Sequence, residues 1–290
     1  MTEHEIKQQV SDFYNKIGWK VENDGFYQNA RYEDLRPVSR EYIHKCHLRV
    51  NRYLSPTGKF LLDAGSGPVQ WPEYLTYSKD FEYRLCLDTS IVALKEARKS
   101  LGEKGLFVVS DVAALPFKAD TFDGLVSLHT LHHITPEEQP AAYEGFVRVL
   151  KPGRSGVVVN AWVSPHLVKK MQPLVLFMDR VNGFLNRGKK LKASPVPINN
   201  ETHKPKPTGT FTLHITPEWL KERLTGKVDF QIRVWRSVSV RFLRSVIQPW
   251  LLGKLWLKLL FWLEDCNPVY FGENGQYPLI VIRKPSIPNK

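Results

Sequence analysis

Three acidic residues and two glycines stand at points between residues 60 and 111 where they could bind a polar ligand. Asp63 opens the segment DAGSGP (63–68), which follows an apolar run. Asp88 ends the run YRLCLD, and Asp111 ends the run GLFVVSD. Because glycine has no side chain, it allows a tight turn and a close approach of the backbone to a ligand. A carboxylate accepts hydrogen bonds, so Asp88 could hold the two hydroxyls of a ribose.

Short apolar runs alternate with helix-like stretches between residues 60 and 162. Runs that are apolar nearly throughout are typical of strands buried on both faces of a parallel sheet. Helix-like stretches between such runs predict right-handed βαβ units and a doubly wound α/β sheet. The runs stand at 60–65, 83–88, 105–111, 122–129 and 155–162, with helix-like stretches at 90–101 and 136–150.

The acids are expected to face one crevice, since ligands of open α/β sheets bind beyond the carboxyl ends of the strands. There Asp111 and the backbone N–H of Val112 could read an adenine edge. Each acid alone could instead cap a helix, and the glycine turn alone could be structural. All three acids in succession are hard to explain as caps, so the spacing favours a nucleoside-like ligand.

The segments on either side of this region predict four parts of the chain. Helix-like patterns at 3–17 and 38–54 precede it, and 165–186 follows as a helix interrupted at Pro173. A Pro- and Lys-rich loop (188–210), a capped helix (216–224) and strands at 228–235 and 277–285 come next, which makes a mostly parallel seven-stranded sheet. The expected parts are an N-terminal helical cap (1–57), a ligand-binding core (58–163), a substrate-lobe insertion (164–215) and a C-terminal completion of the sheet (216–290).

The ordered motifs between residues 58 and 162 resemble the class I S-adenosylmethionine-dependent methyltransferases. They are DAGSGP (63–68), Asp88, SDVAALPFKADTFD (110–123), LHTLHHI (128–134) and RVLKPG (148–153). The closest likeness is to the small-molecule branch that includes the ubiquinone/menaquinone C-methyltransferases. The resemblance implies the Rossmann-like methyltransferase fold and S-adenosyl-L-methionine as the cofactor.

The resemblance also implies which residues hold the cofactor. The turn from Asp63 to Gly67 would hold its methionine part, Asp88 the ribose, and Asp111 with Val112 the adenine. The chain around Ser127–His129, which includes Leu128, would lie near the sulfonium. Tyr14 could close over the cofactor as part of an N-terminal lid. The expected cofactor-binding residues are Asp63, Ala64, Gly65, Ser66, Gly67, Asp88, Thr89, Asp111, Val112, Leu128 and Tyr14.

Two departures from the family pattern and two rival classes bear on this interpretation. Val69 stands where the family often has a third glycine, and Arg154 replaces the second glycine of KPGG. A dehydrogenase would need G-x-G-x-x-G to cradle pyrophosphate, and Gln70 breaks that pattern. A cofactor-binding module without catalysis is the other rival, and the intact acids and glycines argue against it.

Methyl transfer from a sulfonium is an in-line displacement, so the protein mainly aligns the reacting atoms and excludes water. A base is needed only if the acceptor must lose a proton. His133 and His129, at the end of the fourth expected strand, are the candidate bases because imidazole titrates near neutral pH. Either could instead serve only as a structural hydrogen-bonding group. The three cysteines are too scattered for a zinc site or a disulfide framework, and no metal is expected.

The acceptor is expected to be a small molecule, of O- or C-methylation type, with an anionic or lipid-like character. The net charge of +12 resides in 165–260, which contains 18 Lys+Arg against 5 Asp+Glu. The apolar, lysine-bearing segment 248–265 is expected to be a helix, which could contact a membrane peripherally, line an acceptor pocket or pack on the sheet. Nucleic acid is disfavoured because no appended RNA-binding motif is evident, although RNA or protein remains the alternative acceptor.

The location and assembly of the protein are less constrained by sequence. The N-terminus is polar and no apolar run reaches the ~20 residues that span a bilayer, which favours a cytoplasmic protein. The oligomeric state stays open.

Overall fold

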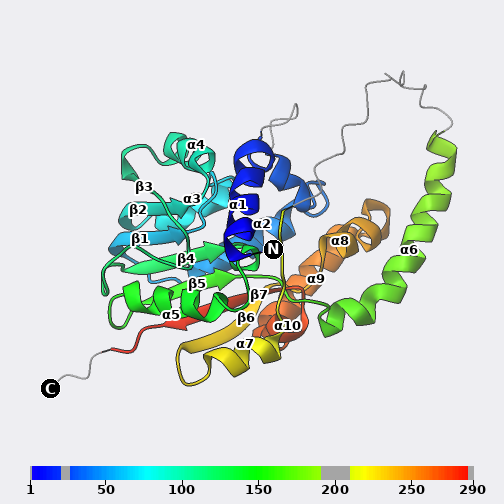
Figure 1. Ribbon diagram of the computed structural model, residues 1–290. Helices are drawn as coiled ribbons and strands as arrows, with labels where there is room; N and C mark the ends of the chain where they lie inside the picture. The colour runs from blue at the N-terminus through cyan, green and yellow to red at the C-terminus, as the bar shows by residue number, and fades with distance from the viewer. Residues whose placement is uncertain (1, 21–26, 191–209, 287–290) are drawn as a thin grey trace.

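The computed structural model describes residues 2–20, 27–190 and 210–286, and side chains in that part except at 186–190. Its centre is a seven-stranded sheet in the order β3-β2-β1-β4-β5-β7-β6, flanked by helices (Figure 1). β7 runs antiparallel to its neighbours β5 and β6, and the other strand pairs are parallel. The prediction of a doubly wound, mostly parallel α/β sheet is confirmed.

The strands are buried because alternate side chains enter two apolar layers on opposite faces of the sheet. Leu61 and Val126 pack in one layer, and Leu62 and Leu125 pack in the other. The strands are β1 (Gly58–Ala64), β2 (Phe81–Asp88), β3 (Gly105–Val109), β4 (Gly124–Leu128), β5 (Ser155–Val159), β6 (Asp229–Arg236) and β7 (Tyr277–Arg283).

Several helices begin at residues whose side chains cap them. Thr2 forms a capping box with Glu5, and the hydroxyls of Ser90 and Thr216 accept from backbone N–H groups of the next turn. The α-helices are α1 (Glu3–Phe13), α2 (Arg40–Leu48), α3 (Pro72–Leu75), α4 (Ile91–Leu101), α5 (Gln139–Val149), α6 (His166–Lys190), α7 (Pro217–Leu224), α8 (Val240–Val246), α9 (Gly253–Cys266) and α10 (Pro268–Asn274). Short 3-10 or π turns include η1 (Tyr14–Gly18), η2 (Gln28–Tyr32), η3 (Arg49–Arg52), η6 (Leu131–His133) and η7 (Pro249–Leu251).

Two helix predictions are wrong in detail. α6 continues through Pro173, because the lost backbone hydrogen bond is outweighed by packing at the buried Val175 and Met178. The helix expected from residue 248 begins only at Gly253, since Leu252 adopts a left-handed φ of 55°. Of the expected loop at 188–210, residues 188–190 belong to α6 and 191–209 lie outside the described part of the chain.

A buried carboxylate joins the N-terminal helices to the C-terminal ones. Glu264 on α9 is fully buried and accepts hydrogen bonds from the Tyr42 hydroxyl (2.7 Å) and the Arg49 guanidinium (2.8 Å). Ser237, just after β6, donates to it from both its backbone N–H and its hydroxyl. Because a buried charge is stable only when it is paired, this network fixes which face of α9 points inward. Among the helices described, none is long and apolar enough to cross a membrane.

Candidate functional site

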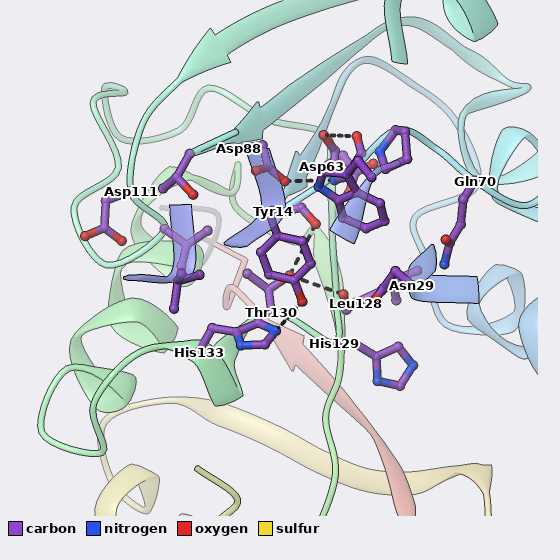
Figure 2. Close-up of a pocket in the computed structure, with 18 of the residues that line it drawn as sticks. Tyr14, Asn29, Asp63, Gln70, Asp88, Asp111, Leu128, His129, Thr130 and His133 are labelled. Carbon is purple, nitrogen blue, oxygen red and sulfur yellow. Dashed lines mark hydrogen bonds between the residues drawn. The ribbon is translucent and has the colours of Figure 1, made fainter. Parts of the chain in front are cut away.

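A cavity of about 130 Å³ opens beyond the carboxyl ends of β1 to β4 (Figure 2). Every residue expected at the site lines it except Ala64, whose side chain is buried in the core at the end of β1. The remaining lining comes from the N-terminal segment and from the loops after β1 and β4. The expected residues on the cavity wall are Tyr14, Asp63, Gly65, Ser66, Gly67, Asp88, Thr89, Asp111, Val112, Leu128, His129 and His133.

The turn after β1 requires glycine at two positions. Gly65 and Gly67 have φ of 76° and 55°, and a Cβ on Gly65 would lie 2.2 Å from the side chain of Thr130. A Cβ on Gly67 would meet the Trp19 ring at 3.0 Å. Val69, at the family's third glycine, also has a positive φ of 54°. The turn therefore keeps a glycine-like conformation there at a cost in backbone strain.

Asp63 has a structural role as well as a place on the cavity wall. Its side chain is nearly fully buried, and Oδ2 accepts two hydrogen bonds from the Arg84 guanidinium, from Nε at 3.0 Å and from Nη2. Arg84 is itself buried and also donates to the backbone carbonyl of Tyr74. The pair ties the end of β1 to the middle of β2 and fixes the carboxylate at the cavity wall.

Asp88 is held at the centre of the site by backbone N–H groups. Oδ2 accepts from Gly67 at 2.9 Å and Oδ1 accepts from Ser90 at 2.8 Å. Desolvation outweighs these two bonds and raises the pKa of Asp88 to about 6. The carboxylate is thus oriented by the glycine turn, and each oxygen keeps a lone pair for a ligand hydroxyl.

Asp111 carries an ion pair that the sequence does not indicate. Nζ of Lys7, on α1, lies 2.7 Å from Asp111 and 2.5 Å from Glu138. These acids, together with Glu3, raise the pKa of Lys7 well above its usual value although desolvation acts to lower it. These ion pairs therefore hold α1 against the end of the cavity that Asp111 and Val112 line.

Tyr14 and Trp19 form an aromatic wall between this helix and the glycine turn. Their rings stack with centroids 5.1 Å apart, and the Tyr14 hydroxyl points toward His133 (Figure 2). Tyr14 Oη lies 2.7 Å from His133 Nε2, while His133 Nδ1 lies 2.8 Å from the carbonyl oxygen of Phe211. Since a carbonyl can only accept, Nδ1 carries the proton and Nε2 accepts from Tyr14.

The two candidate bases are neutral imidazoles at neutral pH. Burial lowers the pKa of His133 to about 4, and burial together with Arg236 lowers that of His129 to about 3. His129 has a positive φ of 55° and packs edge-on against the rings of Trp235 and Tyr277. A strained backbone at a cavity wall is typical of functional positions.

Several lining residues are not signalled by sequence, and two leave polar atoms unsatisfied. Trp19 Nε1 and Gln70 Oε1 are buried and have no hydrogen-bond partner among the described residues. Such groups cost free energy unless a ligand pairs with them. Trp19 Nε1 is a donor and Gln70 Oε1 is an acceptor, and both border the cavity beside the turn that contains Gly65 and Gly67. They suit the amino-acid part of a nucleoside ligand, so the residues present fit S-adenosylmethionine. The further lining residues are Lys7, Val10, Trp19, Asn29, Pro68, Gln70, Tyr74, Thr130 and Ile134.

Comparison with known proteins agrees with this geometry. Residues 62–158 match the family model described as "Methyltransferase domain". An uncharacterized methyltransferase of Geobacillus sp. (strain WCH70) is 30% identical over 124 residues, 43% of this chain and 51% of that protein. A tRNA (carboxymethyluridine(34)-5-O)-methyltransferase of Arabidopsis thaliana is 32% identical over 160 residues, 47% of this chain and 37% of that protein. The chain thus spans about half or less of the length of these curated relatives.

Two solved structures share the fold at low sequence identity. DhpI in its complex with S-adenosylhomocysteine superposes with a TM-score of 0.57 at 13% identity, covering 99% of this chain and 100% of DhpI. The [4+2]-cyclase SpnF superposes with a TM-score of 0.52 at 18% identity, covering 97% of each chain. At such identities the likeness shows the fold alone.

Residues 62–158 therefore form a methyltransferase domain within a Rossmann-like class I fold. This domain is similar to the S-adenosylmethionine-dependent methyltransferases, and S-adenosylmethionine is the cofactor of that class. Membership of the ubiquinone/menaquinone C-methyltransferase branch stays a prediction.

Proposed function

We propose that the protein transfers a methyl group from S-adenosylmethionine to oxygen or carbon of a small acceptor with an anionic or lipid-like character. One observation carries the proposal. The Tyr14–His133 pair lies on the wall of the same cavity as the glycine turn and Asp88. Groups able to hold a cofactor and groups able to move a proton therefore share one site.

The cofactor would be held by residues from three segments. The turn from Asp63 to Gly67, with Trp19 Nε1 and Gln70 Oε1, would bind the methionine part, and Asp88 would accept from the ribose hydroxyls. Asp111 and Val112 would face the adenine. When bound, the cofactor supplies an electrophilic methyl group, and the protein's contribution is alignment and exclusion of water.

Proton removal from the acceptor would run through Tyr14 and His133. An acceptor hydroxyl would give its proton to Tyr14 Oη as Tyr14 passes its own proton to His133 Nε2, which the Nδ1–Phe211 bond keeps unprotonated. His133 is neutral at pH 7, so Nε2 can accept a proton, but burial lowers its pKa to about 4 and makes it a weaker base than an exposed imidazole. His129 is the second candidate base, and its ring would border the acceptor beside Trp235 and Tyr277.

Methylation of RNA is the second candidate function. The Arabidopsis relative is named as a tRNA methyltransferase, and the strongly basic segment 165–260 would suit a polyanion. Small molecules are favoured because no RNA-binding motif is evident beside the methyltransferase domain.

Labelled cofactor and mass spectrometry would test the proposal. The full chain is incubated with methyl-deuterated S-adenosylmethionine and, separately, with a metabolite extract, a lipid extract and unmodified tRNA. We expect label in a small acceptor, with turnover abolished by His133→Asn and retained by His166→Asn, a substitution of an exposed histidine on α6. Label in tRNA alone would establish the second candidate, and release of unmethylated products with the cofactor intact would contradict methyl transfer.

A further inference from the structure

An exposed apolar surface lies on η7 and α9, away from the cavity. We call it the tryptophan face, and its most exposed members are Trp250 (55%), Leu252 (68%), Leu255 (62%), Trp256 (58%) and Trp262 (60%). Single exposed apolar residues are normal on a protein surface, but a contiguous group of this kind marks a site of interaction. The complete set is Trp250, Leu251, Leu252, Leu255, Trp256, Leu259, Trp262 and Leu263.

The spacing of these residues gives α9 a buried side and a separate, exposed apolar side. Gly253, Leu257 and Glu264 are buried and form the inward side. Leu255, Trp256, Leu259, Trp262 and Leu263 follow an i, i+1, i+4, i+7, i+8 pattern, which places them on one stripe of the helix. This stripe is exposed, so one side of α9 packs against the protein and the opposite side faces outward.

The helix cannot turn to hide this stripe. Rotation of α9 would pull Glu264 out of its bonds to Tyr42, Arg49 and Ser237 and leave the Arg49 guanidinium buried beside an apolar surface. Breaking a buried ion pair by removing one partner is strongly destabilising. The outward orientation of the tryptophan face is therefore built into the fold.

The unpaired charges beside the face on α9 are positive, because the exposed acid of this helix, Asp265, is paired with Arg49 and Arg52. Lys254 and Lys258 are exposed one turn apart on α9, and residues 238–263 contain no aspartate or glutamate. Glu41 stands close enough to both lysines for them to help lower its pKa, but it is bonded to Lys45. If a second copy of the chain docked here through the same face, its lysines would lie near Lys254 and Lys258 and repel them. Anionic lipid headgroups would instead attract both lysines.

We propose that the tryptophan face docks on the surface of a membrane that contains anionic lipids. Tryptophan is enriched where protein meets the headgroup layer, because its ring is apolar and its N–H needs a polar partner. Leucines on the same stripe would enter the acyl boundary, and Lys254 and Lys258 would contact headgroups. The exposed Phe177 and Phe184 on α6 provide further apolar surface in the same half of the chain.

Co-sedimentation of the full chain with vesicles tests the proposal without cofactor or acceptor, so its outcome is independent of the proposed methyl transfer. We expect binding to vesicles of phosphatidylcholine with phosphatidylglycerol, weakened by salt and by omission of phosphatidylglycerol. Trp256→Ser/Trp262→Ser should weaken binding about tenfold or more, since each side chain loses its burial in the interface. Lys254→Gln/Lys258→Gln should weaken binding to the anionic vesicles by roughly 10- to 30-fold.

A matched control replaces equally exposed apolar residues elsewhere. Ile91→Ser/Val109→Ser removes side chains that are 48% and 54% exposed and should leave vesicle binding unchanged. Circular dichroism and cofactor titration confirm that each variant is folded. The proposal is overturned if the full chain binds neither vesicle type. It is also overturned if the double tryptophan variant binds vesicles as strongly as the control variant does. A dimer in sedimentation velocity that only the tryptophan substitutions dissociate would also overturn it, in favour of a second copy.

Discussion

The hydroxyl of Tyr14 lies 2.7 Å from Nε2 of His133, which joins the N-terminal segment to the turn after β4 across 119 positions of sequence. Because His133 is anchored through Nδ1 to Phe211, the tyrosine is oriented by a third segment as well. The contact that holds the N-terminal segment at the cavity wall is thus the same contact that orients Tyr14 toward the proposed proton acceptor.

Removal of the Tyr14 hydroxyl should affect turnover more than cofactor affinity. Tyr14→Phe breaks the proposed proton path, so kcat should fall by about 10²- to 10⁴-fold, the usual contribution of general acid–base catalysis. Cofactor affinity by calorimetry should change little, because the ring and its stacking on Trp19 remain. Tyr270→Phe, at an exposed tyrosine, is the control. Equal turnover by both variants would exclude the path.

Cofactor affinity should depend on pH through Asp88. The ionised carboxylate is the acceptor for ribose hydroxyls, and its pKa is about 6, so affinity should fall as the pH drops through that value. Asp88→Asn should weaken binding by roughly 10- to 100-fold, as expected for a lost charge-assisted hydrogen bond, and should abolish the pH dependence. Asp229→Asn, at an exposed acid, should leave both unchanged. Calorimetric titration on either side of the pKa decides between these outcomes.

The same raised pKa has a consequence for stability, with the opposite dependence on pH. Its value in the folded protein lies above the ordinary 3.8, so folding favours the protonated form. The corresponding stabilisation is fully present below about pH 3.8 and is lost as the pH rises through about 6. Urea titrations of wild type and Asp88→Asn should diverge over this interval. Parallel curves would mean that Asp88 is not the group responsible.

Breaking the Asp63–Arg84 pair should destabilise the protein strongly. Arg84→Met leaves the carboxylate buried without its partner, which should lower the free energy of unfolding by about 3–5 kcal/mol. The double variant Asp63→Leu/Arg84→Met should recover most of this loss while impairing cofactor binding. Urea unfolding measures the first effect, and Arg98→Met, at an exposed arginine on α4, is the control. A double variant no more stable than Arg84→Met would show that the loss comes from packing.

Lys7 should make cofactor affinity sensitive to salt. Lys7→Met removes the ion pairs that fasten α1 at Asp111 and Glu138, and affinity should fall by about 2- to 10-fold at low ionic strength. The wild type should approach the variant as salt is added, because partly exposed ion pairs are screened. Lys16→Met, which removes an exposed pair with Asp12, is the matched control. Titrations at low and high salt distinguish this effect from a general loss of charge.

The sheet could be predicted from sequence because each strand is a short apolar run, and burial on both faces leaves that pattern. The residues at which individual strands end are harder to predict. The run at 105–111 forms a strand only to Val109, since the Asp111 side chain accepts from the N–H of Ala113 and turns the chain. The antiparallel place of β7 has no local signal, because strand order depends on pairing between distant segments.

The site could be predicted in part for a similar reason. Residues at strand ends, such as Asp88 and His129, share one rim through topology alone, so spacing along the chain reveals them. Lys7, Trp19 and Gln70 reach the cavity through tertiary packing, and nothing in their neighbouring sequence marks that contact. Arg84 was equally hidden, since within a strand it gives no sign that it is paired with Asp63.

The place of β7 between β5 and β6 orders events during synthesis of the chain. The strands from β1 to β5 can pair as they emerge from the ribosome, whereas β6 touches no strand but β7 in the sheet described. β6 therefore has no strand to pair with until β7 has been translated, and its apolar side chains stay unburied by the sheet during that time. Nascent chains paused between the two strands are where aggregation or chaperone capture should be greatest.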